Sequence, residues 1–421
     1  MTGLLATVPA NFSQRPVILA IFTITYVGMA VGHVPGLKLN RVGIALLGAI
    51  AMIIFGNVST NDVVAWINWP TIFLLFGFFV ISAQLRLSGF YDLVAGGISA
   101  RLGHPARFLL VLMLVTGGLS AFLNHDIVCY VFAPIVGTAL LRQQLNPIPY
   151  LIALAIASNL GAAATLIGNP QDMMIGQVAH LSFGHYLLWS AVPVMLAMAA
   201  AYGIIWKLSQ KKLVSTLTAT AESTLPPRPF NRPHTIKGLV ILAVVIGLFF
   251  SSLPKEVIAL AAAGIHLAST RFRTDDLLGL VEWPILVLFM GLFVVTGAFQ
   301  ATGCGEQAVQ WLAHAGLDLN SSSILAVATA MLSNLIGNSA TVMLMLKVVD
   351  VTHATTAYVL ALANSFGGSL TILGSVANII VVQQAREQGI NITFRDFARL
   401  GVPVTLAAMA GLLVWVMLMT Y

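Results

Sequence analysis

Long apolar runs alternate with short polar breaks along almost the whole chain. From Val17 onward, apolar windows recur that are long enough for membrane helices, since one helix needs about 20 such residues to cross a bilayer core of about 30 Å. In the first half these runs predict helices over 17–34, 42–57, 69–85, 107–141, 150–181 and 186–206. Apolar residues make up 58% of the 421 residues and charged residues only 8%, which is more apolar surface than a soluble core hides. The pattern predicts an all-α integral membrane protein.

The two halves of the chain resemble each other. Trp69-Pro70 and the apolar run after it recur as Trp283-Pro284 and a similar run, an offset of 214 residues. Three further matches follow in the same order: Asn124 with Asn338, 165–168 with 371–374, and 192–194 with 402–404. Colinear matches of this kind indicate a duplicated unit. We therefore divide the chain into a first repeat, 1–206, a linker, 207–237, and a second repeat, 238–421.

Two segments of the first repeat do not look like simple crossings. The arms 107–123 and 127–141 are each shorter than about 20 residues, which favours a re-entrant helical hairpin that enters and leaves on one side. Segment 150–181 contains Gly168 and Pro170, which open a helix, and it counts as one discontinuous crossing. Each repeat then has five membrane-crossing helices. Because five is odd, the second repeat must have inverted topology.

The basic residues predict an orientation in the membrane. This topology places the 20 lysines and arginines on one face, except Arg15, Lys255 and Lys347. By the positive-inside rule that face is cytoplasmic. We therefore expect a multi-pass plasma (inner) membrane protein, in contact with lipid, whose termini both lie on the outer, periplasmic face. Segments 88–102 and 303–316 are expected to lie in the two interfaces. The formal charge of +6 forms no patch beside stacking aromatics, so nucleic acid is not an expected partner.

Two carboxylates fall inside predicted membrane segments, and both lie where a helix is interrupted. They are Asp126, in the hairpin turn, and Asp172, just after Pro170. A charged side chain at the bilayer centre costs on the order of 3 kcal/mol or more, so it marks a functional site by default. Interrupted backbone at this depth must be buried in protein or line a cavity. We expect four interruptions to converge at the midplane: 124–126, 161–172, 337–341 and 367–378.

These interruptions supply the candidate residues. The predicted substrate and ion site consists of Asn124, Asp126, Thr165, Asn169, Asp172, Asn338, Ser339, Thr341, Thr371, Ser375 and Asn378. The predicted proton-coupling groups are Asp126, Asp172 and His125, because each can titrate. Cys129 and Cys304 lie far apart and lack metal-ligand spacing. We therefore expect no metal site and no cofactor.

Three stretches carry a family resemblance: Ser158 to Gln171, Asn124-His125-Asp126, and Asn338 to Thr341. They resemble the ion transporter superfamily, which includes arsenite permeases, plant silicon efflux transporters, sodium/proton antiporters and divalent anion/sodium symporters. The first two stretches resemble the arsenite and silicon branch. The third resembles the Ser-Asn-Thr signatures with which the anion symporters hold substrate and sodium. This chain departs from those patterns at Asp172, where the branch usually has Asn, and at Asp126, where sodium-coupled anion carriers have a neutral hydroxyl residue.

The resemblance and the carboxylates together predict a proton-coupled exporter of trivalent arsenic or antimony, carried as the neutral hydroxide. Asp126, with Asp172, would bind either a proton or the metalloid, as antiport requires. A carboxylate at the hairpin tip would repel a dianion, which disfavours dicarboxylate and sulfate. Two alternatives with the same fold are a sodium/proton antiporter and a transporter of inorganic or carboxylate anions.

Other classes of protein fit the sequence less well. It shows no nucleophile with a base in reach and no phosphate-binding loop, so we expect neither an enzyme nor an ATPase. A channel would not need duplicated broken helices. A homodimer and a separate ATPase subunit are partners that the sequence leaves open.

Overall fold

The computed structural model describes residues 14–31, 39–99, 104–213, 230–268, 271–319 and 321–420. Within these ranges the chain is helical and contains no strand, as the apolar pattern predicts. Some predictions concern residues outside these ranges. They are those for Lys38, Arg101, Arg228, the end of the first helix and the centre of the linker. The described ends of the linker are helical, because one helix continues to Leu213 and the next begins at Arg232.

The helices form two series. The first comprises α1 (Arg15–Val31), α2 (Arg41–Ile54), α3 (Thr60–Trp66), α4 (Trp69–Leu87), α5 (Phe90–Ser99), α6 (Pro105–Phe122), α7 (His125–Arg142), α8 (Ile148–Ala162), α9 (Pro170–Val178) and α10 (Phe183–Leu213). The second comprises α11 (Arg232–Leu248), α12 (Lys255–Leu267), α13 (Thr274–Leu278), α14 (Trp283–Ala301), α15 (Cys304–His314), α16 (Ser322–Ile336), α17 (Asn338–Val348), α18 (Ala354–Gly367), the 3-10 turn η1 (Ile372–Gly374), α19 (Val376–Glu387) and α20 (Phe394–Thr420).

The second series repeats the first in its order of elements. α4 and α14 are both 19 residues long, and α18, η1 and α19 are interrupted as α8 and α9 are. The packing is also reciprocal, since α4 packs against α12 as α14 packs against α2, and α6 against α8 as α16 against α18. Reciprocal contacts are what a two-fold relation between two similar units produces. The inversion across a membrane stays a prediction.

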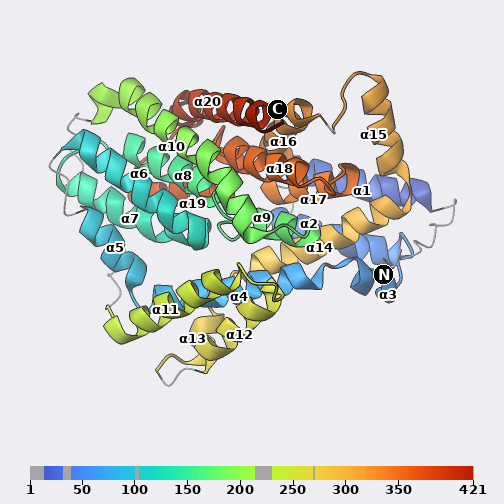
Figure 1. Ribbon diagram of the computed structural model, residues 1–421, viewed down its shortest axis with the longest axis horizontal. Coiled ribbons are helices and arrows are strands. Elements are labelled where there is room, and N and C mark those ends of the chain that lie inside the picture. The colour runs from blue at the N-terminus through green and yellow to red at the C-terminus, as the bar shows by residue number, and fades with distance from the viewer. Residues whose placement is uncertain are drawn as a thin grey trace.

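The helices surround a core of broken and hairpin helices. In Figure 1, α4, α11 and α12 run along the lower edge of the molecule and α10 and α20 along the upper edge. The short helices α5 and α15, which begin the two hairpin regions, lie at opposite ends of the molecule (Figure 1). That these helices lie in the two membrane interfaces stays a prediction.

Six helices among the described residues are long and apolar enough to cross a membrane, judged by length and composition: α4, α6, α7, α10, α14 and α20. α1, α2, α8 and α16 are shorter apolar helices. Large apolar side chains face outward, for example Ile24, 72% exposed, and Leu188, 74% exposed. Exposed apolar surface over so many helices suits lipid rather than water. The protein is thus a multi-pass membrane protein, while five crossings per repeat remains a prediction.

The hairpin arms differ from their predicted lengths. α6 and α7 are 18 residues each, or about 27 Å at 1.5 Å per residue. The predicted arms, 107–123 and 127–141, are shorter because α6 already begins at Pro105, which suits the first turn of a helix, and α7 continues past Pro134 to Arg142. In the second hairpin α16 has 15 residues and α17 only 11. Arm length therefore favours re-entry in the second hairpin alone.

Candidate functional site

The hairpin tips and the broken helices of both halves meet at one small cavity. It is bordered by Met29, Arg41, His125, Asp126, Gln171, Leu288, Ile336, Gly337, Asn338, Ser339, Ala340, Ser375 and Val376. Its volume is about 30 Å³, roughly the share of one water molecule in the liquid. The cavity is therefore no larger than one water molecule in this conformation.

Helix N-termini surround this cavity. α2, α7, α9, α17 and α19 all begin at or beside residues that border it, and four of them are capped by polar side chains: Asn40 for α2, Asn124 for α7, Asn169 for α9 and Ser375 for α19. Each helix N-terminus carries roughly half a positive charge, because the N–H groups of its first turn have no carbonyl acceptor within the same helix. The cavity is therefore suited to oxygen atoms that accept hydrogen bonds or carry negative charge.

Asp126 is the acid of the cavity. The carboxyl group is buried, with the residue 5% exposed, and the backbone N–H of Asp126 donates to Asn124 Oδ1 at 2.8 Å. His125 Nε2 lies 3.4 Å from Asp126 Oδ1. Among the described residues, Asp126 Oδ1 and His125 Nδ1 have no hydrogen-bond partner. Buried polar atoms are nearly always paired, so these two are open to a proton, a water or a cargo oxygen.

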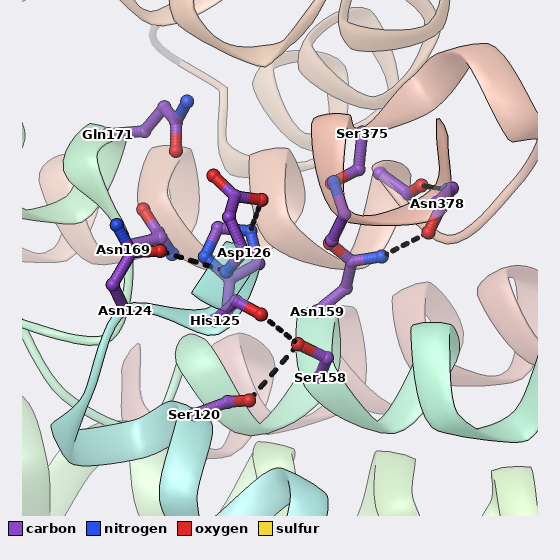
Figure 2. A network of polar contacts seen from close by, with 12 residues as sticks. Ser120, Asn124, His125, Asp126, Ser158, Asn159, Asn169, Gln171, Ser375 and Asn378 are labelled. Carbon is purple, nitrogen blue, oxygen red and sulfur yellow. Dashed lines mark hydrogen bonds and ion pairs between the residues drawn. The ribbon is translucent and has the colours of Figure 1, made fainter. Parts of the chain in front are cut away.

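A polar network fixes the first hairpin tip, as Figure 2 shows. Ser158 of α8 donates to the carbonyl of His125 at 3.2 Å, and the hydroxyls of Ser120 and Ser158 lie 3.0 Å apart. The backbone N–H of His125 donates to the carbonyl of Gly168 at 3.4 Å. The tip is therefore held by α6, by α8 and by the loop before α9.

Asp172 lies behind the cavity wall and not on it. It is fully buried, and its Oδ2 accepts from Asn169 Nδ2 at 2.6 Å and from the Ser365 hydroxyl at 3.4 Å. Its Oδ1 has no partner among the described residues. Gln171, beside it, borders the cavity and donates to Ser339 at 2.8 Å. Among the described residues, no hydrogen bond or ion pair joins Asp172 to Asp126.

The contacts between the halves are reciprocal at residue level. Asn159 of α8 donates to Asn378 Oδ1 at 2.8 Å (Figure 2), and Ser365 of α18 donates to Asp172. Asn159 and Ser365 occupy matching positions in the two repeats, as do Asp172 and Asn378, each pair 206 residues apart. The two broken helices are thus joined crosswise, α8 to α19 and α18 to α9.

Several predicted site residues have structural partners instead of facing the cavity. Thr165 donates to the carbonyl of Ala121 in α6, and Thr371 donates to Asn334 Oδ1 at 2.9 Å in α16. Asn378 also donates to the carbonyls of Gly368 and Thr371. Of the predicted residues, those that border the cavity are His125, Asp126, Asn338, Ser339 and Ser375; those that do not are Asn124, Thr165, Asn169, Asp172, Thr341, Thr371 and Asn378.

Two polar residues of the cavity, Gln171 and Arg41, were not predicted as site residues from the sequence. Gln171 was recognised only as part of a motif, and its position two residues after the Asn169 cap was the available signal. Arg41 was assigned to the cytoplasmic face from its position before an apolar run. Nothing in its local sequence indicates that it reaches the second hairpin tip.

A group of charged residues lies beside the start of α7, near the tip of the first hairpin and on the side of the predicted cytoplasmic face. The Arg86 guanidinium lies 4.4 Å from the centre of the Tyr130 ring, one turn after Asp126 on α7. Glu282, just before α14, has a raised pKa because burial disfavours its charged form, and the charge of Asp126 adds to this while Arg86 opposes it. Glu282 thus extends the series of ionisable groups from Asp126 towards that face.

A larger cavity of about 770 Å³ lies between α1, α3, α14 and α17. Trp66, Asp62 and Lys347 border it, and its lining contains none of the predicted site residues. By the predicted topology it opens to the outer face. The smaller cavity remains the candidate site because it alone, of these two, combines helix N-termini with the buried carboxylate.

Comparisons with known proteins agree with this fold. A family model described as citrate transporter (CitMHS) matches residues 17–360. An uncharacterised transporter of Mycobacterium tuberculosis (strain ATCC 25618 / H37Rv) is 32% identical over 400 residues, which covers 87% of this chain and 91% of that one. Silicon efflux transporter LSI3 of Oryza sativa subsp. japonica is 27% identical over 449 residues, covering 90% and 92%. The crystal structure of the YdaH transporter of Alcanivorax borkumensis has a similar fold, with a TM-score of 0.63 at 13% identity over 97% of this chain and 98% of that one.

The matched range contains the first hairpin, the first broken helix and the tip of the second hairpin, and so includes most of the cavity. The family match covers well over half of the chain, and the similarity to the relatives extends along nearly all of it. The chain therefore belongs to the citrate transporter (CitMHS) family, within the ion transporter superfamily, and is a secondary membrane transporter.

Proposed function

We propose that this transporter is proton-coupled and exports a small oxyacid, with the hydroxides of trivalent arsenic and antimony as its candidate cargo. The observation that carries the proposal is the meeting of both hairpin tips and both broken helices at one cavity beside the open carboxylate of Asp126. Asn338, Ser339, Ser375 and Gln171 offer amides and hydroxyls to the hydroxyl groups of such a cargo. The rice relative is named for silicon, an element that also forms weak oxyacids.

Transport uses two inverted repeats, 1–206 and 238–421, joined by the cytoplasmic linker 207–237. The reciprocal packing of α4 on α12 and α14 on α2 supports this arrangement, and so do the crosswise bonds of Asn159 and Ser365. The site then lies at the interface of the repeats in the plasma membrane, with both termini outside. The 770 Å³ cavity is the outer vestibule of the conformation seen here.

Asp126 couples the proton to the cargo. In the exporter, a proton from outside and the oxyacid from inside bind at its carboxylate in turn, because one oxygen cannot hold both. His125, 3.4 Å away, orients the carboxylate, and Asp172, held by Asn169 and Ser365 behind the cavity wall, is the second proton-coupling group. The proton gradient drives the exchange, and the different affinities of the two conformational states for proton and cargo couple the two fluxes.

A second candidate cargo is an inorganic or carboxylate anion. The observation that favours it is the position of Arg41, a cation that borders the cavity although its place in the sequence predicted the cytoplasmic face. The citrate description of the family points in the same direction. No observation on the described residues favours the sodium/proton antiporter over these two.

Flux into inside-out membrane vesicles tests the proposal. An imposed pH gradient, acid inside, should drive arsenite into vesicles that contain the protein, and Asp126→Asn should abolish the dependence on the gradient. Citrate and sodium serve as the competing cargoes. Uptake of citrate or sodium without arsenite would refute the metalloid cargo, and an unchanged pH dependence in Asp126→Asn would remove Asp126 from the mechanism.

Replacing both cysteines tests how the metalloid is held. Cys129 is buried on α7 and Cys304 begins α15, with no bond between them. Two separated thiols cannot surround one arsenic atom, so Cys129→Ala with Cys304→Ala should leave export unchanged. Loss of export in this double variant would mean that thiols, and not hydroxyls and amides, bind the cargo.

A further inference from the structure

Arg86 and Tyr130 join two helices that do not pack along each other. The Arg86 guanidinium, in the last turn of α4, lies 4.4 Å from the centre of the Tyr130 ring on α7. In the described part of the chain, the helices that pack along α7 are α5, α6, α8 and α19, and α4 is not among them. The contact of α4 with α7 is therefore made by two long side chains, which rotate far more easily than packed helices separate.

Tyr130 lies between Asp126 and the predicted cytoplasmic face. It follows Asp126 by four residues, so both lie on one face of α7, and this helix continues beyond Tyr130 to Arg142. Asp126 is 5% exposed, whereas Tyr130 and Arg86 are both partly exposed. The pair of side chains thus stands between the buried acid and that face.

Glu282 adds an acid to the same place. It immediately precedes α14, is partly exposed, and lies close enough to Asp126 and Arg86 for their charges to act on it. No ion pair between Arg86 and Glu282 occurs among the described residues. A guanidinium is stabilised both by an aromatic ring and by a carboxylate. Arg86 can therefore leave Tyr130 for Glu282 and keep a partner for its charge.

The matching positions on the other side of the molecule border an open cavity. At the repeat offset of 214 residues, Arg86 corresponds to Gln300 and Glu282 to Asn68. Gln300 and Asn68 both border the cavity of about 770 Å³. Where two inverted repeats exchange conformations, a region that is open on one face has a counterpart that opens on the other. The counterpart of the outer cavity is thus the region that Arg86 and Tyr130 bridge.

We propose that Arg86, Tyr130 and Glu282 line the passage by which cargo reaches the site from the cytoplasm, and that the contact of Arg86 with Tyr130 closes this passage in the conformation seen here. The inference rests on the proposed function for the direction of transport and adds the entry route to it. A neutral hydroxide suits such a passage, because neither Arg86 nor Glu282 would hold it as it would hold an ion of opposite charge.

The test measures how fast a cysteine placed in the cavity reacts from the cytoplasmic side. The full-length chain carries Cys129→Ala, Cys304→Ala and Ser339→Cys, because Ser339 borders the cavity and is 8% exposed. A small, membrane-impermeant methanethiosulfonate reagent is added to inside-out vesicles. Tyr130→Leu removes the ring and should raise the reaction rate about tenfold, whereas Tyr130→Phe keeps the ring and should stay within twofold. Tenfold corresponds to about 1.4 kcal/mol, which lies within the range of a partly desolvated cation–π contact.

Arg86→Gln tests the same contact from the other helix and serves if Tyr130→Leu does not fold. It should raise the rate as Tyr130→Leu does, while Arg142→Gln, which removes an exposed arginine from the end of α7, should leave the rate unchanged. Rates within twofold of the unmodified passage for both Tyr130→Leu and Arg86→Gln would overturn the proposal. The labelling needs no cargo, so a failure of arsenite transport would refute the metalloid cargo and leave this test of the passage intact.

Discussion

Gly161→Ala should destabilise the protein by forcing apart two helices that touch through their backbones. A methyl group at position 161 of α8 would lie against the Cα and carbonyl oxygen of Gly117 in α6, and 2.6 Å from its carbonyl carbon. Carbon atoms in contact prefer about 3.5–4.0 Å, so the helices must separate by about 1 Å. Overpacking of this kind costs about 1–3 kcal/mol.

The same separation reaches the candidate site. The hydroxyls of Ser120 and Ser158, 3.0 Å apart, bridge the same two helices, and Ser158 also holds the carbonyl of His125. A shift of about 1 Å takes the bridge beyond hydrogen-bond distance, at a further cost of about 1 kcal/mol. We therefore expect Gly161→Ala to lower both the thermal stability and the rate of transport, because the first hairpin tip moves.

Gly118→Ala is the matched control. Gly118 lies in α6, one residue after Gly117, and a Cβ at Gly118 would meet no atom within 4 Å. Alanine is favoured over glycine within a helix by up to about 1 kcal/mol, so this variant should be as stable as the unmodified protein or more so. Tryptophan fluorescence during thermal unfolding in detergent measures both. Equal melting temperatures for the two variants would refute the close helix contact and the reasoning built on it.

Three further predictions concern the site itself. Asp172→Asn preserves size and an acceptor oxygen for Asn169, so the melting temperature should stay within a few degrees while the pH dependence of transport flattens; an unchanged pH profile would contradict a coupling role. Gly337→Ala should cost about 1–3 kcal/mol from its backbone conformation and should displace Arg41, which unfolding curves and cargo binding detect together. Burial and the charge of Asp126 raise the pKa of Glu282, so its side chain stays protonated to higher pH than an ordinary glutamate. Glu282→Gln should therefore flatten the pH profile of flux in inside-out vesicles within the range where Glu282 titrates. The same profile in the unmodified protein and in Glu282→Gln would exclude Glu282 from proton coupling.

Helix interruptions were predictable from the sequence because their signals are local. Asn124 and Asn169 each accept a hydrogen bond from the first turn of the following helix, as N-cap residues do, and Pro170 occupies the first position of α9. The repeat offset then located the second pair of interruptions without any three-dimensional information. Helix order, the breaks and the burial of both carboxylates all follow from such short-range patterns.

Which polar side chains reach the cavity depends on long-range packing between helices, and the sequence pattern does not show it. Thr165 and Thr371 lie in the interrupted stretches, as predicted, but their hydroxyls bond to the first hairpin arms, α6 and α16, and not to the cavity. Arg41 meets Gly337, which lies 296 residues further along the chain (337 − 41 = 296). Such contacts depend on how helices are placed relative to one another, and a residue pattern within one helix carries no record of that placement.

The difference between the repeats is the strongest guide to where coupling occurs. Matching positions share the polar scaffold, as Asn124 matches Asn338 and Thr165 matches Thr371. The titratable groups are not shared: Asp126 and Asp172 of the first repeat correspond in sequence to Ala340 and Asn378 of the second. Because a two-fold related scaffold holds cargo oxygens from both sides equally, an unpaired acid is what can make the site depend on a proton. We therefore propose that the first repeat supplies the coupling, while the second repeat contributes Asn338, Ser339 and Ser375 to the cavity wall.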